Sequence, residues 1–287
     1  MPIETRREFT RHALQSLTAL ALIEGLGAHR LFGADVQPIV DEWFKELDSI
    51  SRDVHDRRIK DVEFQKALEG LYGRVDLPAL LKTLDFDRMA AGVNFPALGA
   101  RSLPVDFKNV SGLPTSLVFG RQIFAMSKGR SVIPHGHDNM ATGFLILKGT
   151  LRGRHYDRIE DHKDHYIVRP TIDRTFTPGQ CSTISDHKDN VHWFQAESDS
   201  AFIFNIHVND TDPGNPKRPG RVYVDPQGEK LAGGLIKGDQ RLAVSPGEGF
   251  QQHFLETVTA VIRVVIPLLG FRQINRYKHI VQAVEPS

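Results

Sequence analysis

Cysteine is almost absent from this chain. Cys181 is the only one among 287 residues, which excludes an internal disulfide framework and a zinc site built on several thiolates. We expect Cys181 itself to be a small buried apolar residue. A metal site in this chain must therefore use other donors.

An excess of charge of one sign is also lacking. Lysine and arginine together number 36, and aspartate and glutamate number 35, so the formal net charge is +1. A broad basic field is the usual mark of a nucleic-acid-binding protein. We therefore expect no nucleic-acid partner.

The chain also lacks a long uninterrupted apolar run. Residues 258–271 are apolar, but Arg263 stands near their centre and Pro267 breaks them. The run is shorter than the roughly 20 residues that a membrane-spanning helix needs. We predict no integral membrane domain beyond an N-terminal anchor. Residues 226–287 are interpreted as a C-terminal extension that packs on the barrel or forms an oligomer contact.

The first 34 residues carry an export pattern. An arginine pair, Arg6-Arg7, precedes an apolar run over residues 13–23. This order resembles a twin-arginine signal that is removed or kept as an anchor, and it predicts an exported, periplasmic protein. The alternative is a cytoplasmic protein with an ordinary first helix, because Thr5 and Glu8 have the spacing of a helix capping box.

The rest of the composition is that of a soluble globular protein, with 40% hydrophobic and 25% charged residues. Over residues 35–95 the apolar positions recur every three or four residues, which is the period of an amphipathic helix. Gly70, Gly73 and Pro78 divide this pattern, so it predicts three short helices. We expect them to form a helical cap on the outside of the next domain, without a catalytic part.

From Ser116 the pattern changes to short strand-like runs separated by glycine and proline turns. Such a pattern predicts a mainly β fold, either a sandwich or a barrel, over residues 96–225. A polar stretch over residues 157–164 is interpreted as an insertion. We interpret His162 and His165, which lie in and beside it, as solvated loop residues and not as ligands.

Two histidines, His135 and His137, stand one residue apart. Alternate residues of a strand point to the same face, so a strand here directs both imidazoles into one space. His192, on a strand-like run after the Pro178-Gly179 turn, is the best candidate for a third ligand. We predict that His135, His137 and His192 hold one metal ion.

The order of these motifs resembles the cupin signature. The matching positions are Gly129, His135-x-His137, an apolar run that ends at Gly149, the turn Pro178-Gly179, and His192. The resemblance implies a cupin double-stranded β-helix, a jelly-roll barrel, with an N-terminal helical segment before it.

The chain departs from the common cupin pattern at one point. Most cupins place a glutamate ligand four or five residues after the second histidine, where this chain has Ala141 and Thr142. The resemblance therefore implies a three-histidine site without a carboxylate. Asp138 follows His137 directly, so a strand turns its side chain to the opposite face.

Three-histidine cupins resemble the thiol dioxygenases, namely cysteine dioxygenase, cysteamine dioxygenase and the plant cysteine oxidases. Local similarity to that group spans roughly residues 100–225, and its most similar stretches are residues 132–137, 148–151, 155–157 and 189–196. The resemblance implies a mononuclear non-haem Fe(II) dioxygenase that oxidises a small thiol with dioxygen to a sulfinic acid. Three neutral imidazoles leave the full charge of the ion uncancelled, which favours an anionic thiolate as the incoming ligand.

The resemblance also implies residues around the metal. His207, fifteen residues after His192, is similar to the outer-sphere histidine of the cysteine dioxygenases, and the alternative is a core or barrel-rim histidine. Tyr156 either lies near the site or packs in the barrel. The arginine that holds the substrate carboxylate in that family has a loose counterpart in Lys108, with Arg121 as a second candidate. The alternative for both is a surface position.

Two other classes of function stay open at this point. One is a different metal-dependent cupin enzyme, such as a lyase, an isomerase or a dioxygenase of a carbon substrate. The other is a cupin that binds a metal or a ligand without turnover. The missing glutamate favours the thiol dioxygenase over the first of these. The sequence is compatible with an oligomer, and it does not name the thiol.

Overall fold

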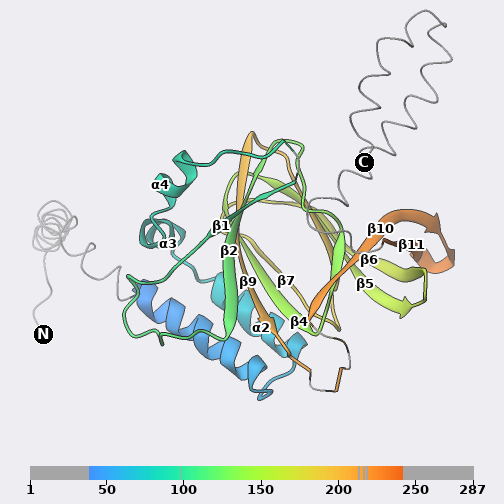
Figure 1. The fold of residues 1–287 in the computed structure, drawn as a ribbon, viewed down its shortest axis with the longest axis horizontal. Helices are drawn as coiled ribbons and strands as arrows, with labels where there is room; N and C mark the ends of the chain where they lie inside the picture. The colour runs from blue at the N-terminus through green and yellow to red at the C-terminus, as the bar shows by residue number, and fades with distance from the viewer. Residues whose placement is uncertain (1–38, 98, 213, 216, 218, 242–287) are drawn as a thin grey trace, which may run out of the picture. The chain divides into compact units, whose positions relative to one another are not determined.

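The computed structural model describes residues 39–97, 99–212, 214–215, 217 and 219–241 (Figure 1). The export pattern over residues 1–34 lies outside these residues, as does most of the extension over 226–287. Export, anchoring and the role of the extension therefore stay predictions.

Four helices precede the strands in the described part of the chain, one more than the sequence pattern predicts. They cover residues 39–55, α2 (Asp61–Tyr72), α3 (Leu77–Thr83) and α4 (Phe86–Ala91). Asp76 caps α3 by accepting a hydrogen bond from the backbone N–H of Ala79 at 3.0 Å. Asp85, with a φ of 51°, separates α3 from α4. None of the helices in this part has the length and apolar composition of a membrane span.

The strands of the described residues form two sheets, and the mainly β fold with an N-terminal helical segment is confirmed. A five-stranded sheet has the order β1-β2-β9-β4-β7, and six strands close into a barrel with the order β10-β11-β6-β5-β8-β3. The bounds are β1 Arg101–Pro104, β2 Phe119–Ser127, β3 His135–Asp138, β4 Met140–Lys148, β5 Leu151–Asp161, β6 His165–Phe176, β7 Cys181–Ile184, β8 Val191–Ala196, β9 Ser200–Asn209, β10 Gly220–Lys230 and β11 Ile236–Arg241. The two facing sheets are those of the jelly roll that the cupin resemblance implies.

Both faces of the five-stranded sheet are covered, which explains its long apolar runs. On β9, Phe202, Phe204 and Ile206 pack against the helices. The alternating residues Ala201 and Ile203 face the other way and pack against strands of the six-stranded barrel. α2 lies along β4 and β7, and Figure 1 shows the helices gathered on this side of the strands. A strand that is buried on both faces reads as a continuous hydrophobic run and not as an alternation.

The structure differs from the predicted boundaries in two places. Residues 157–164, predicted to be a polar insertion, are mostly the end of β5 and the turn of the β5–β6 hairpin. The barrel also continues beyond residue 225, because β10 runs to Lys230 and β11 pairs antiparallel with β6. Both segments are polar and half-exposed, so they lack the apolar alternation that identifies a strand from sequence.

Candidate metal centre

The polar end of the space between the two sheets holds the three predicted ligands. Along the inward-facing row of β9, apolar Ala201 and Ile203 give way to Asn205 and His207. On β3, His135 and His137 face the same space, and His135 is the register partner of His192 on β8. The antiparallel pairing of β3 with β8 thus brings together histidines that lie more than fifty residues apart in the sequence.

The three imidazoles are close enough to share one ion. One nitrogen from each of His135, His137 and His192 lies within 4.8 Å of the others. All three rings are buried, with exposed fractions of 2%, 4% and 2%. The ring centroids are 4.2 Å apart for His135 and His192, and 5.1 Å apart for the other two pairs. No carboxylate or thiolate belongs to this cluster among the described residues.

The hydrogen bonds of the rings leave nitrogens free for a metal. His135 donates from Nδ1 to the carbonyl oxygen of Ile133 at 2.7 Å, so its Nε2 carries the lone pair. His137 Nδ1 lies 3.1 Å from Oγ1 of Thr142, and its buried Nε2 has no hydrogen-bond partner in the described part of the chain. A buried nitrogen without a partner is costly unless a ligand satisfies it. The donor set of neutral imidazoles suits a divalent transition-metal ion.

Burial keeps the three histidines neutral. Burial first, and then the charge of the nearby Arg221, lower the pKa of His135 to about 3. Burial also lowers the pKa of His137 and of His192 well below 6.5, with repulsion between the rings as the next cause. At neutral pH each of the three rings is therefore an uncharged imidazole, which has one lone pair that a metal ion can use.

A pocket of about 470 Å³, its open mouth included, leads to the histidines. Its apolar wall comes from both sheets, and its polar groups lie around the metal centre. Its lining residues are Phe124, Val132, His135, His137, Met140, Thr142, Phe144, His192, Phe194, Ile203, Asn205, His207 and Arg221. A pocket in which an apolar wall faces convergent polar groups is a usual form of small-molecule site.

Among the described residues, Arg221 is the cation that lines this pocket, and no sequence motif predicts it as a site residue. It lies on β10, where it is the register partner of His137 on β3. Its charge lowers the pKa of His135, His137, His192 and His207. An anionic group beside the metal centre would meet this guanidinium. The sequence indicates only that Arg221 lies within residues 96–225, the range predicted to form the barrel.

His207 lies in the pocket, where its ring passes over β2. Gly120 is its register partner on that strand, and a Cβ atom added to Gly120 would overlap the imidazole of His207. Burial lowers the pKa of His207, and Arg221 adds to the effect. The ring is therefore a neutral group that can donate or accept one hydrogen bond within the pocket.

The two predicted substrate-binding cations lie elsewhere. Lys108 is exposed in the segment between β1 and β2, where it pairs with Asp106 at 3.1 Å. Arg121 is opposite Ile206 on β9 and stacks over the ring of Phe107, on the side of the helices. Arg121 follows Gly120 by one residue, and a step of one residue along a strand reverses the face.

Tyr156 does not line the pocket either. It packs in a separate apolar cluster with Tyr166, Val168 and Val191. The preceding residue, His155, is opposite His192 and faces the same side of the sheet. His155 is fully buried, and its nearest polar partner is the hydroxyl of Ser182 at 3.1 Å.

The remaining residues singled out from the sequence lie outside the centre. His162 is in the turn of the β5–β6 hairpin beside Glu160, and His165 begins β6 beside Asp164. Cys181 is partly buried against the cluster of helices and sheet. Asp138 lies on the face opposite to the histidines, where its carboxylate accepts a hydrogen bond from Arg158 at 2.7 Å.

No protein-family model and no curated protein sequence matches the chain. Its fold is similar to that of a Thermus thermophilus protein, at 13% identity and a TM-score of 0.31, over 42% of this chain and 93% of the other. A cupin superfamily protein from Desulfitobacterium hafniense is similar at 15% identity and a TM-score of 0.29, over 42% of this chain and 88% of the other. An oxalate oxidase is similar at 16% identity and a TM-score of 0.32, over 45% of this chain and 56% of the other. At this level of similarity no activity, metal or substrate follows for this chain.

Proposed function

We propose that this protein is a mononuclear non-haem Fe(II) dioxygenase that oxidises a small thiol to a sulfinic acid. The observation that carries the proposal is the cluster of three buried neutral histidines, without a carboxylate ligand among the described residues, beside the guanidinium of Arg221. His135, His137 and His192 would hold the ion. The bound ion would supply a Lewis acid that lowers the pKa of the thiol and a redox partner for dioxygen.

The overall reaction is balanced by one thiol and one dioxygen molecule. Both oxygen atoms become bonded to sulfur, which loses four electrons, and the same four electrons reduce dioxygen. The hydrogen of the thiol ends on the sulfinic acid. No further reductant is needed.

The pocket residues have separate tasks in this proposal. Arg221 binds an anionic group of the substrate, and a carboxylate suits its fork of donors. His207 provides a hydrogen bond to charge that develops on the reacting atoms. The apolar wall, which includes Phe124, Phe144 and Phe194, excludes water and so strengthens both interactions. These tasks favour a substrate such as cysteine or 3-mercaptopropionate over cysteamine, which has no carboxylate.

The test combines metal analysis with oxygen uptake, on protein purified without a histidine tag. We expect iron at about one ion per chain, given one three-imidazole site, and oxygen consumption with a carboxylate-bearing thiol. His135→Ala should remove both. A metal-loaded protein that consumes no oxygen with cysteine, cysteamine or 3-mercaptopropionate would contradict the proposal. It would favour a different metal-dependent cupin enzyme or a cupin that binds without turnover.

A further inference from the structure

The strand that carries two of the metal ligands has little support on the side of β8. β3 is four residues long, and it is paired with β10 at every one of its positions. With β8 it shares a single pair, His135 with His192. β8 begins only at Val191, so the strand ladder ends before it reaches the carbonyl group of His137. A backbone oxygen at such a position needs another donor.

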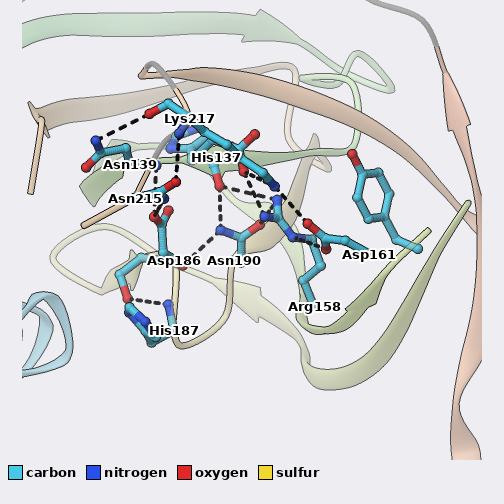
Figure 2. Close-up of polar contacts among 12 residues, drawn as sticks. His137, Asn139, Arg158, Asp161, Asp186, His187, Asn190, Asn215 and Lys217 are labelled. Atoms are coloured by element: carbon cyan, nitrogen blue, oxygen red, sulfur yellow. Dashed lines mark hydrogen bonds and ion pairs between the residues drawn. The ribbon is translucent and has the colours of Figure 1, made fainter. Parts of the chain in front are cut away.

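Side chains on the face opposite to the metal ligands supply that donor. Asn190 donates from Nδ2 to the carbonyl oxygen of His137 at 2.7 Å and to that of Ser185 at 3.1 Å. Arg158 donates from Nη1 to the same His137 oxygen at 3.4 Å and to Oδ1 of Asn190 at 3.3 Å. Figure 2 shows these contacts meeting at the backbone of His137. Both donors and the acceptor of the Asn190 amide are thereby used.

The glycine between the two histidines belongs to the same arrangement. A Cβ atom added to Gly136 would point away from the metal ligands and would overlap Oδ1 of Asn190. Asn190 is 1% exposed, so its amide has no room to withdraw. The space that a side chain at position 136 would fill is therefore occupied by the group that holds His137.

A charge network fixes the other end of this arrangement. Arg158 donates from Nη2 to Oδ1 of Asp138 at 2.7 Å, and its Nε lies 2.8 Å from Oδ1 of Asp161. Lys217 approaches both carboxylates, at 3.3 Å and 2.8 Å. The side chains of Arg158 and Asp138 are only 10% and 12% exposed. A charge-assisted pair in such a position is stronger than an exposed one and restricts the arginine to one orientation.

We infer that Asn190 and Arg158 are positioning residues of the metal centre, which hold the backbone of the His135–His137 strand from the face opposite to the metal. They contact neither the ion nor the substrate. They fix the position of the His137 ring relative to the rings of His135 and His192. Position 136 is a glycine because Asn190 occupies the space that a side chain there would need. The inference rests on the proposed metal centre, and it assigns a role to residues that the centre itself does not use.

The test is a double-mutant cycle on metal affinity, with Co(II) as the probe and its visible absorption as the spectroscopic signal. Asn190→Ala and Gly136→Ala should each weaken Co(II) binding by about 10- to 100-fold, the scale known for residues that support ligands. Both changes disturb the same contact. The Co(II) affinity of the double variant should therefore equal, to within about twofold, that of whichever single variant binds Co(II) less tightly.

A control separates positioning from general loss of stability. Asp76→Ala removes the cap of α3, on the helical side, and should lower the melting temperature of the metal-free protein without changing Co(II) affinity. Arg158→Met is a second probe if Asn190→Ala does not fold. Its control is Arg74→Met, because Arg74 pairs with Glu46 at 2.6 Å on the helical side. Arg158→Met should weaken Co(II) binding and Arg74→Met should not.

Two results would overturn the inference. The first is Co(II) affinity within about twofold of the wild type in the Asn190, Gly136 and Arg158 variants. The second is a double variant whose loss equals the product of the two single losses, which would mean that the two sites act independently. Wild-type protein that binds no Co(II) would instead refute the proposed metal centre, and the inference with it.

Discussion

The hydroxyl oxygen of Thr142 lies 3.1 Å from Nδ1 of His137. Thr142 stands at one of the two positions where many cupins carry a glutamate ligand. Thr142 is 1% exposed and lines the pocket, whereas Ala141 faces the helical side. Of the two positions for the missing carboxylate, only position 142 therefore points at the metal centre. The threonine there contacts the ring of His137 and is not a member of the three-histidine cluster.

Thr142→Val should weaken metal binding without changing the shape of the strand. Valine keeps the branched side chain but removes the acceptor, so the buried Nδ1–H of His137 would lose its partner. We expect about a 10- to 100-fold loss of Co(II) affinity, measured by titration. Thr183→Val is the matched control, since Thr183 is 2% exposed on β7 but bonds to Glu69 on α2. Equal losses in both variants would contradict the role of Thr142.

Arg221→Met should raise the KM for carboxylate-bearing thiols. Loss of a charge-assisted hydrogen bond corresponds to about a 10- to 100-fold change. The KM for cysteamine should not rise, because cysteamine offers no anion to the guanidinium, and kcat should change less than KM. Arg169→Met, an exposed arginine paired with Asp157, is the control. A rise of equal size for cysteamine would refute carboxylate recognition by Arg221.

His207→Ala should separate catalysis from metal binding. The ring lies in the pocket but outside the three-histidine cluster, so iron content should stay nearly intact. Turnover should fall by about 10²-fold or more, the scale for removal of one preorganised donor. Gly120→Ala tests the same residue by displacing its ring. Unchanged turnover in both variants would leave His207 as a barrel-rim histidine, and loss of iron would make it a support of the centre.

His187 should make stability depend on pH. Its Nδ1 lies 2.8 Å from a carboxylate oxygen of Asp61 at the start of α2, and this hydrogen bond raises the pKa of His187 above 6.5. A raised pKa in the folded state stabilises the protein fully below pH 6.5, and this contribution is lost as the pH rises through the raised value. The pair is partly exposed, so its size should be about 0.2–1 kcal/mol.

The measurement for His187 is a series of denaturant titrations from pH 5.5 to about 9, a range that brackets the usual pKa of histidine. His187→Gln should be less stable than the wild type at the acid end, and the difference should shrink towards the alkaline end. His162→Gln, in the exposed turn of the β5–β6 hairpin, is the control. A difference that is constant over the range, or that grows with pH, would contradict the ion pair.

The parts of the site that lie within one strand could be predicted from the sequence, and the parts that depend on register between strands could not. His135 and His137 share a face because they stand two positions apart on a strand, whatever the rest of the chain does. Arg221 joins them only because β10 pairs with β3 after a polar loop. No local pattern around Arg221 encodes that pairing.

Arg121 and Tyr156 lie outside the pocket for one physical reason. Each lies next to a residue that faces the interior, Gly120 in the first case and His155 in the second. A shift of one residue along a strand moves a side chain to the other face. The helical cap and the β class were easier to predict, because periodicity over many residues survives such a shift. The fourth helix, α4, was missed because it is short, and the β5–β6 hairpin was missed because its end is polar.

Oxygen-isotope labelling tests the proposed reaction most directly. The iron-loaded protein would be supplied with ¹⁸O₂ and 3-mercaptopropionate in unlabelled water, with catalase present to remove peroxide, and the mass of the product would be measured by mass spectrometry. Because both atoms of one dioxygen molecule end on sulfur in this account, it predicts a sulfinic acid that carries two ¹⁸O atoms and forms in step with oxygen consumption. A product with no label, or oxygen consumption without a sulfinic acid, would contradict a thiol dioxygenase.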